Sequence, residues 1–551
     1  MRHKKVTPKK QSAHTTLSSV WTQQNSPALL WILSLTLIVS AALLFTRLGH
    51  YALWDDEAID GLIGKGILQA GDTSGLIGHN VMAYRNGLLL HTLRVEGEPP
   101  LTAYAAAASM KLFGETAGAA RLPIALFAFA GVALILWWIW KLRPSPLIAS
   151  VFSIGLLCNV SFFLYSRQCH YYGVAIFCFI AITYIYFNWQ GRKSMLLAMG
   201  LCSALLLAAN YSFFLVLYAC LFADYVIWQR KVRTFKFADI SVLVALPFLT
   251  GLALMAWWNP FHTQIGSRLA HDSLSERFTL FFWHWRDLNR CEMCVGLLLL
   301  LAPVTAFICK DAWLKRALFA LGLYVVGMTV LSTQSISDTS VSDVRYFSAL
   351  IPLFILIETI TIRDLTIKAS WLAIPVALIA FGTNLLNGGP LLPWGFRSTV
   401  ANYIGELLHP PGDPYSVTSQ WINDNVHDGE SIWVAPDYMT YPLMFHAPKP
   451  IYAWQLAANN HDSQFADLPP IHFQGRVAPD YIITFGPHTQ EAVQTLQSWS
   501  WKFPTTSYEQ IATLDCYWKD LYRPELFWRT FKPTTGYNKQ AEAIYVFKRK
   551  Q

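Results

Sequence analysis

Long apolar segments alternate with short polar connections through the first 390 residues of the chain. A helix that crosses a membrane needs about 20 predominantly apolar residues, and eleven segments approach that length. They cover residues 28–46, 122–140, 146–164, 173–189, 194–209, 212–228, 238–258, 293–309, 317–333, 346–362 and 370–388. The pattern predicts a polytopic α-helical membrane domain, 28–390, with about eleven transmembrane helices.

The charges between these segments predict their direction of crossing. Cytoplasmic loops of membrane proteins carry an excess of Lys and Arg, and here every second connection is basic and short. A basic tail, 1–27, precedes the first segment, which we interpret as an uncleaved signal anchor with its N-terminus in the cytoplasm. The basic residues of the predicted inner loops are Lys141, Arg143, Arg192, Lys193, Arg230, Lys231, Arg233, Lys236, Lys310, Lys315, Arg316, Arg363 and Lys368.

An odd number of spans leaves the C-terminal part of the chain on the outer face. There the apolar runs shrink to strand length, at 431–435, 481–485 and 543–547, and an amphipathic helix is expected at 416–425. We therefore predict a C-terminal α/β domain, 400–551, on the outer, periplasmic side. Three outer connections are also long: 47–121, 259–292 and 332–345.

Composition supports this assignment. Hydrophobic residues make up 54% of the 551 residues and charged residues only 14%, against about 25% charged in typical soluble proteins. So few charges exclude a soluble globular protein and a disordered chain. The formal charge of +8 does not indicate nucleic-acid binding, because many of the basic residues flank apolar segments.

The nine cysteines predict no disulfide scaffold. Cys291 and Cys294 form a CxxC pair, but a structural zinc site needs four ligands and there is no second CxxC. A disulfide and unpaired thiols both remain open for this pair.

Carboxylates open the first long outer connection. Asp55, Asp56 and Glu57 directly follow Trp54. Beside an apolar membrane surface the pKa of a carboxylate rises, so it can accept a proton near neutral pH. Adjacent residues cannot share one helix face, so one carboxylate can act on a substrate while the next serves a cation or the scaffold. Further along, Pro99 and Pro100 would hold Glu98 in a rigid position. The alternative interpretation is an ordinary solvated loop.

Five short motifs occur in order along roughly the first 360 residues. The Asp-Glu pair at 56–57 and the Pro-Pro-Leu at 99–101 are followed by FGxxxxxARLPxALF at 113–127, YSRQCHYY at 165–172 and RYFSALIP at 345–352. Together they resemble the GT-C glycosyltransferases of the protein O-mannosyltransferase and lipid A aminoarabinose transferase type (PMT-like, ArnT-like). The resemblance implies the GT-C fold and inverting transfer of a monosaccharide from a polyprenyl-phosphate donor, such as an undecaprenyl-phosphate sugar. It places the protein in the bacterial inner (plasma) membrane, with transfer on its periplasmic face.

The same resemblance assigns roles to individual residues. Asp56 would be the catalytic base on the acceptor hydroxyl, and Glu57 its supporting or cation-binding neighbour. Glu98 stands where relatives often have Lys or His, which favours a cation or sugar hydroxyls there. A divalent metal cation, with Glu57 and Glu98 as candidate ligands, is the only cofactor considered. Tyr172 stands where many relatives have Asp, so with Asp55 it is a further candidate for contact with substrate or cation.

Cationic residues near the outer face are candidates for the donor phosphate. Arg345 suits a departing phosphate because a guanidinium is planar and always charged, and Arg167 and His170 are further candidates. The alternative for all three is snorkelling to the membrane interface. The fourth outer connection adds a cationic cluster whose interpretation as a lipid-headgroup funnel or an interfacial belt stays open: His262, Arg268, His271, Arg277, His284, Arg286 and Arg290.

Two further expectations concern partners. Residues 522–531 are the densest mixture of aromatic and cationic side chains in the C-terminal part, and we hypothesise that they roof the first outer connection and shape the acceptor entrance. The acceptor itself, a lipid, a glycan or a protein, is left open, as is the sugar. The competing function is a transporter or flippase of a lipid-linked saccharide, which would need ionisable residues deep within its spans.

Overall fold

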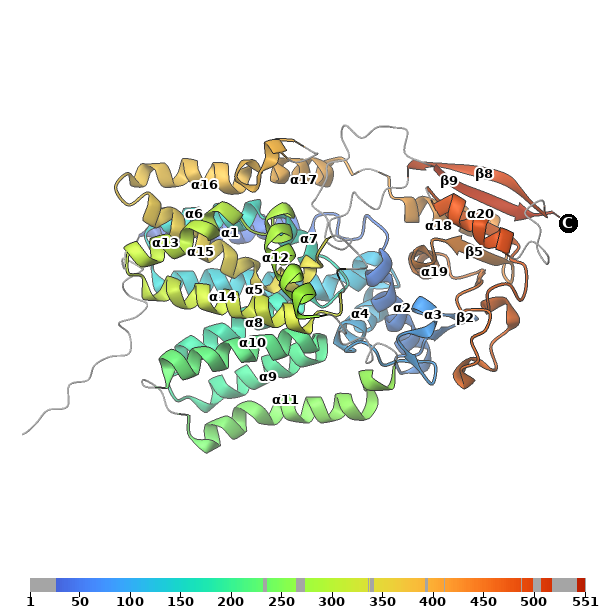
Figure 1. Cartoon of the computed structure of the whole chain (residues 1–551), viewed down its shortest axis with the longest axis horizontal. Coiled ribbons are helices and arrows are strands. Elements are labelled where there is room, and N and C mark those ends of the chain that lie inside the picture. Colours follow the sequence, from blue (N-terminus) through green and yellow to red (C-terminus); the bar gives the residue numbers. More distant parts are fainter. Residues whose placement is uncertain are drawn as a thin grey trace, which may run out of the picture.

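The structure is a computed structural model that describes residues 26–230, 235–263, 273–334, 336, 341–391, 395–410, 412–486, 488–498, 507–517 and 543–550. A helical bundle forms one end of the molecule, and a mixed α/β region forms the other (Figure 1). Most of the predicted basic tail, residues 268 and 271 of the cationic cluster, and the whole 522–531 segment lie outside the described residues.

Each of the eleven predicted apolar segments contains a helix. In chain order these are α1 (Pro27–Phe45), α5 (Ala117–Leu142), α6 and α7 (Pro146–Cys158 and Val160–Ser166), α8 (Tyr172–Asn188), α9 (Lys193–Ala209), α10 (Tyr211–Asp224, extended by a π-helix, Tyr225–Gln229), α11 (Phe237–Trp257), α13 (Gly296–Ile308), α14 (Ala312–Leu331), α15 (Ile351–Leu365) and α16 (Ala373–Gly382). The break between α9 and α10 is a true helix boundary, because the Asn210 side chain caps α10 by accepting a hydrogen bond from the Phe213 amide (3.0 Å).

Within the described residues, six helices are long and apolar enough to cross a membrane. They are Pro27–Phe45, Ala117–Leu142, Tyr211–Gln229, Phe237–His262, Ala312–Leu331 and Val344–Leu365. The pair α6 and α7 makes a seventh if it is one span bent by 59°, and the other apolar helices are shorter. The chain is thus a multi-helix membrane protein, and eleven crossings remain a prediction.

The outer connections are more structured than the sequence pattern predicted. The first contains α2 (Asp55–Ala70), α4 (Leu101–Phe113), the short turn α3 (Tyr84–Gly87), and two hairpins, β1–β2 (Leu76–Ile77 and Asn80–Val81) and β3–β4 (Leu90–His91 and Arg94–Val95). The fourth contains α12 (Leu274–Arg290).

A mixed sheet forms the C-terminal part. Its order is β6-β5-β7-β9-β8, with β5 parallel to β6 and β7, and β9 antiparallel to β7 and β8. The predicted strands and helix are present. The elements are α17 (Thr399–Leu408), α18 (Pro414–Asn425), β5 (Ser431–Ala435), α19 (Thr440–His446), β6 (Ile451–Tyr452), β7 (Tyr481–Phe485), α20 (His488–Ser498), β8 (Tyr508–Tyr517) and β9 (Ala543–Arg549).

This sheet and the first outer connection share one hydrophobic core. Buried side chains such as Leu53 and Ile59 belong to the same cluster as Tyr441 and Phe445 of α19, and α2 and α3 lie against the C-terminal elements (Figure 1). Polar contacts cross the same boundary: Lys65 Nζ donates to the Phe445 carbonyl (2.8 Å). The C-terminal part therefore supports the segment that carries the candidate catalytic residues, instead of standing apart from it.

The CxxC pair lies in the turn between α12 and α13. Cys294 is a buried free thiol, so the two cysteines do not form a disulfide in this structure.

Candidate functional site

The three consecutive carboxylates form the first turn of α2. Negative side chains stabilise a helix N-terminus, where backbone N–H groups lack partners. Successive helical residues point about 100° apart, so Asp55, Asp56 and Glu57 face three different surroundings. The structure gives them three different sets of contacts.

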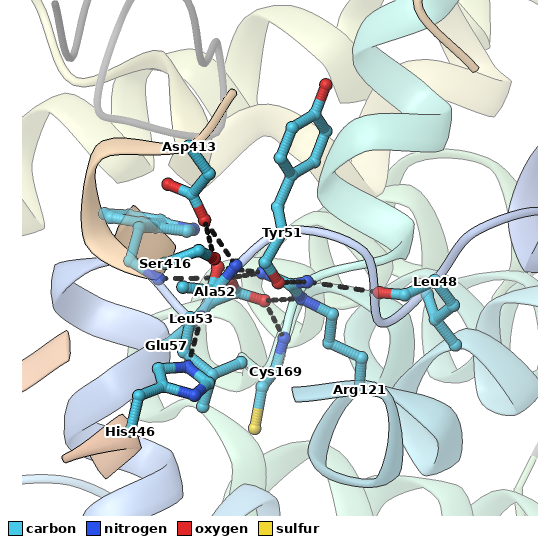
Figure 2. Close-up of polar contacts among 11 residues, drawn as sticks. Leu48, Tyr51, Ala52, Leu53, Glu57, Arg121, Cys169, Asp413, Ser416 and His446 are labelled. Atoms are coloured by element: carbon cyan, nitrogen blue, oxygen red, sulfur yellow. Dashed lines mark hydrogen bonds and ion pairs between the residues drawn. The ribbon is translucent and has the colours of Figure 1, made fainter. Parts of the chain in front are cut away.

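The Glu57 carboxylate is hydrogen-bonded to the surrounding protein (Figure 2). Its carboxylate is fully buried and accepts hydrogen bonds from Arg121 Nε (2.8 Å), Arg121 Nη2 (2.5 Å) and the Cys169 amide (2.6 Å). Arg121 also donates to the carbonyls of Leu48, Tyr51 and Ala52. With both oxygens engaged, Glu57 is a poor candidate for a metal ligand or an acid–base group, and its geometry favours the supporting role.

Asp56 faces the segment that precedes α15. Its Oδ2 forms an ion pair with Nη1 of Arg345, which lies in the 3-10 helix Val344–Leu350 ahead of α15. Arg345 also donates from Nε to Asp343 (2.9 Å). The side chains of Asp56 and Arg345 are each 15% exposed, so this charged pair is only partly shielded from solvent. The candidate base and the candidate phosphate ligand are therefore direct neighbours.

The segment that presents Arg345 is fixed from α12. The buried Asp287 accepts hydrogen bonds on Oδ2 from the amide (2.8 Å) and hydroxyl (3.1 Å) of Ser342. This anchor lies three residues before Arg345 and limits where its guanidinium can reach.

A fourth acidic residue on α2, which the sequence analysis missed, joins the site. Asp60 lies one helical turn after Asp56, and its Oδ2 is 2.5 Å from Nδ1 of His170. Both side chains are buried. Burial alone would lower the pKa of His170, but the adjoining Asp60 carboxylate outweighs it and raises that pKa. The signal was the i, i+4 spacing of Asp56 and Asp60.

Glu98 stands beside this group, at the entrance to α4. Burial raises the pKa of Glu98 to about 7, and the charges of Asp60 and Asp56 add to that rise while His170 and Arg345 oppose it. Its carboxyl group is thus poised between its neutral and charged forms near neutral pH.

Two other predicted residues are buried, and each has a polar atom that forms no hydrogen bond with a described residue. Asp55 is 2% exposed, and its Oδ1 accepts no hydrogen bond from any described residue. Burial, with help from Asp56 and Asp437, raises its pKa well above the ordinary value. The Tyr172 hydroxyl likewise lacks a hydrogen-bond partner within the described parts of the chain, and its ring lies 4.9 Å from that of His170.

Arg167 makes its contacts away from the carboxylates of α2. Its guanidinium donates to the carbonyls of Leu43 (3.2 Å) and Thr46 (2.8 Å) and to the Tyr403 hydroxyl (2.7 Å). These contacts tie the end of α1 to α17. The expectation that Arg167 binds the donor phosphate is therefore not supported, because its donors satisfy the open end of α1.

The described part of the cationic cluster is spread over separate contacts. Arg277 donates to the carbonyls of Thr329 and Ser332, and Arg286 pairs with Asp287. His262 lies 3.1 Å from Glu96. His91, Glu96 and His262 bring their ligand atoms within 4.8 Å of one another and could hold a metal ion. The cation was expected at Glu57 and Glu98, and neither belongs to this group.

An apolar cavity of about 160 Å³ lies inside the helical bundle. It runs between α5, α8, α10, α14 and α15, and Ala349 and Leu350 of the helix that carries Arg345 line it. Asp224 and Arg316 also line the cavity and form a bidentate ion pair (2.9 and 2.7 Å).

No family model and no curated protein matches the chain in sequence. Solved structures do match. ArnT from Cupriavidus metallidurans in the apo state is 13% identical, with a TM-score of 0.54 over 94% of this chain and 97% of that one. ArnT from the same organism bound to undecaprenyl phosphate is also 13% identical, with a TM-score of 0.54 over 95% and 98%. An alignment that spans both chains almost completely shows that this protein has the GT-C fold of ArnT, the fold that its sequence motifs implied.

Proposed function

We propose that the protein is an integral-membrane glycosyltransferase that moves a monosaccharide from a polyprenyl phosphate to an acceptor hydroxyl, with inversion at the anomeric carbon. The observation that carries this proposal is the Asp56–Arg345 pair. It joins a carboxylate suited to accept a proton with a guanidinium suited to bind a phosphate, at the outer ends of two helices.

The donor class draws support from two directions. The similar ArnT structure is described as bound to undecaprenyl phosphate. In this chain, Ala349 and Leu350, four and five residues after Arg345, line the apolar cavity. An isoprenoid tail could pack against this apolar lining with its phosphate toward Arg345, because the cavity and Arg345 share the helix Val344–Leu350.

Donor binding would free the base. The donor phosphate, a phosphodiester with one negative charge and two unesterified oxygens, can take both donors of the Arg345 fork and so competes with Asp56. Asp56 then takes the proton of the acceptor hydroxyl, whose oxygen bonds to the anomeric carbon. The bond from that carbon to the phosphate oxygen breaks, and the electron pair leaves with the polyprenyl phosphate. Attack opposite the leaving group inverts the configuration.

The remaining residues of the site would position Asp56 and Arg345 and adjust the charge around them. Glu57 and Arg121 hold the start of α2, and the Asp60–His170 pair keeps a charged network one turn below Asp56. A metal ion at His91, Glu96 and His262 would neutralise charge beside the first outer connection. Transfer is proposed on the periplasmic face of a bacterial inner membrane.

The test is a transfer assay on the purified full-length protein in nanodiscs. Synthetic short-chain polyprenyl-phosphate sugars serve as donors, and sugar release and transfer are followed by mass spectrometry. Transfer by the wild type and its loss in Asp56→Asn support the proposal. Movement of the donor across proteoliposomes without any sugar release would support the transporter instead.

A further inference from the structure

The carboxyl ends of β5 and β7 in the C-terminal sheet lie near the start of α2, since Asp437 after β5 is among the charges that act on Asp55. In open α/β sheets, ligands bind beyond the carboxyl ends of parallel strands, at the point where the connections leave in opposite directions. Here β5 continues through α19 to β6 on one side, while β7 continues through α20 to β8 on the other. The switch point therefore lies between the carboxyl ends of β5 and β7.

Polar and aromatic residues occupy those ends. Asp437 and Tyr438 follow β5, and His488 begins α20 after β7. The rings of Tyr438 and His488 lie 6.3 Å apart. Asp437 is exposed to solvent, yet the surrounding protein desolvates it enough to raise its pKa. The ring of Tyr441, four residues after Asp437, lies 5.7 Å from that of Tyr84, so the segment after β5 packs against the first outer connection.

The first outer connection supplies the facing wall. Arg85 is exposed, its guanidinium lies 5.3 Å from the Tyr84 ring, and its charge acts on both Asp437 and Asp55. Arg85 and Asn86 both adopt left-handed backbone conformations, with φ of 46° and 61°, which non-glycine residues rarely do. The C-terminal part clamps this turn, because Asn86 Oδ1 accepts hydrogen bonds from the Ala457 amide (2.7 Å) and Asn460 Nδ2 (3.0 Å).

A buried acceptor group connects this wall to the base. Asp55 is 2% exposed and its Oδ1 has no hydrogen-bond partner among the described residues. Unsatisfied buried oxygens are uncommon in folded proteins and call for an explanation. Asp437 and Arg85 are among the charges that act on Asp55, and the next residue is Asp56. An incoming hydroxyl could satisfy Oδ1 on its way to the base.

We propose that Asp437 and Tyr438, with Tyr84, Arg85 and Asp55, form the acceptor subsite, and that this subsite binds a carbohydrate. Carboxylates accept hydrogen bonds from neighbouring sugar hydroxyls, and tyrosine rings pack against the apolar face of a pyranose. Arg85 adds a donor for ring or hydroxyl oxygens. This inference rests on the proposed glycosyltransferase function and names its acceptor class.

The test uses methyl glycosides of glucose, mannose and galactose as acceptor probes, with a serine-containing peptide for comparison. Asp437→Asn should raise the KM for the accepted methyl glycoside about tenfold or more, because hydrogen bonds to charged groups are strong. Its kcat and its KM for the donor should stay within about twofold. Arg85→Asn keeps the left-handed turn, which Asn tolerates, and should have a similar but smaller effect.

The control is Asp428→Asn. Asp428 is exposed and precedes the amino end of the same strand, β5, so its loss should change neither KM. Equal acceptor KM values in wild type and Asp437→Asn would overturn the subsite. Transfer to the peptide but to none of the glycosides would overturn the carbohydrate assignment. A wild type that binds the donor but transfers sugar to no probe and releases none to water would overturn the glycosyltransferase function itself.

Discussion

Asp56 and Arg345 form an ion pair although 289 residues separate them along the chain. In this arrangement the candidate base is neutralised by the group that we assign to the donor phosphate. Under the proposed function, the pair would couple proton abstraction to donor occupancy, because Asp56 stays paired with Arg345 until a donor phosphate takes its place.

This coupling leads to the first prediction. Asp56→Asn keeps the shape of the side chain but removes its charge, so turnover should fall by about 10² to 10⁴. The same change releases Arg345, so the affinity for polyprenyl phosphate should rise. Turnover and phosphate binding are measured on the same nanodisc sample. Asp467→Asn, at an exposed position, is the matched control, and near-normal turnover of Asp56→Asn would remove this residue from the mechanism.

Donor binding is expected to depend on the fork geometry of the Arg345 guanidinium and not only on its charge. Arg345→Lys retains the charge but loses bidentate hydrogen bonding, so we expect donor affinity to fall roughly tenfold with little change in acceptor KM. Arg167→Lys is the comparison, because Arg167 donates to Leu43, Thr46 and Tyr403. It should leave donor affinity unchanged. Equal losses in both variants would contradict the distinction that the structure makes between the two arginines.

The Glu57–Arg121 pair should act on stability and not on metal dependence. Arg121→Met leaves the fully buried Glu57 carboxylate unpaired, which costs about 3 to 5 kcal/mol of unfolding free energy. Arg549→Met breaks a solvent-exposed pair with Asp480 and should cost at most about 1 kcal/mol. Thermal unfolding in detergent gives both values. If added divalent cation restored Arg121→Met, a cation-binding role for Glu57 would return.

The raised pKa of Glu98 predicts that the stability of the protein depends on pH. Its folded-state pKa, raised from 4.5 to about 7, means that the folded protein keeps a proton which the unfolded chain releases above pH 4.5. Stability should therefore fall as pH rises from about 4.5 to 7, by at most about 3 kcal/mol. Glu98→Gln cannot ionise, so its melting temperature should exceed that of the wild type at pH 8 and equal it at pH 4. Identical pH profiles for the two proteins would show that Glu98 ionises normally.

The apolar pattern predicted the helices of the membrane domain because twenty apolar residues in sequence have few other stable arrangements. α2 could not be predicted in this way. Its sequence is short, contains three glycines and opens with three acids, and it is stable because α4 and α19 cover it. Local propensity is a weak signal where tertiary packing supplies most of the stability.

Part of the site was also predictable. The motifs identified Asp56 and Arg345 as candidates, but nothing in the sequence indicated that they touch. Arg121 lay within a recognised motif, yet its pairing with Glu57 spans 64 residues and has no local signature. Arg167, a candidate phosphate ligand from the sequence, donates to the carbonyls of Leu43 and Thr46, because an arginine near a helix end serves open carbonyls as readily as it serves a phosphate.

The strand order of the C-terminal sheet has a consequence for biosynthesis. β9 lies between β7 and β8, so the sheet that supports α2 stays incomplete until residues 543–549 have been made. The acidic turn at Asp55–Glu57 is made about 490 residues earlier and acquires its supporting core only then. Under the proposed function, a nascent chain that stops before β9 would carry every candidate catalytic residue and still lack the core that positions them.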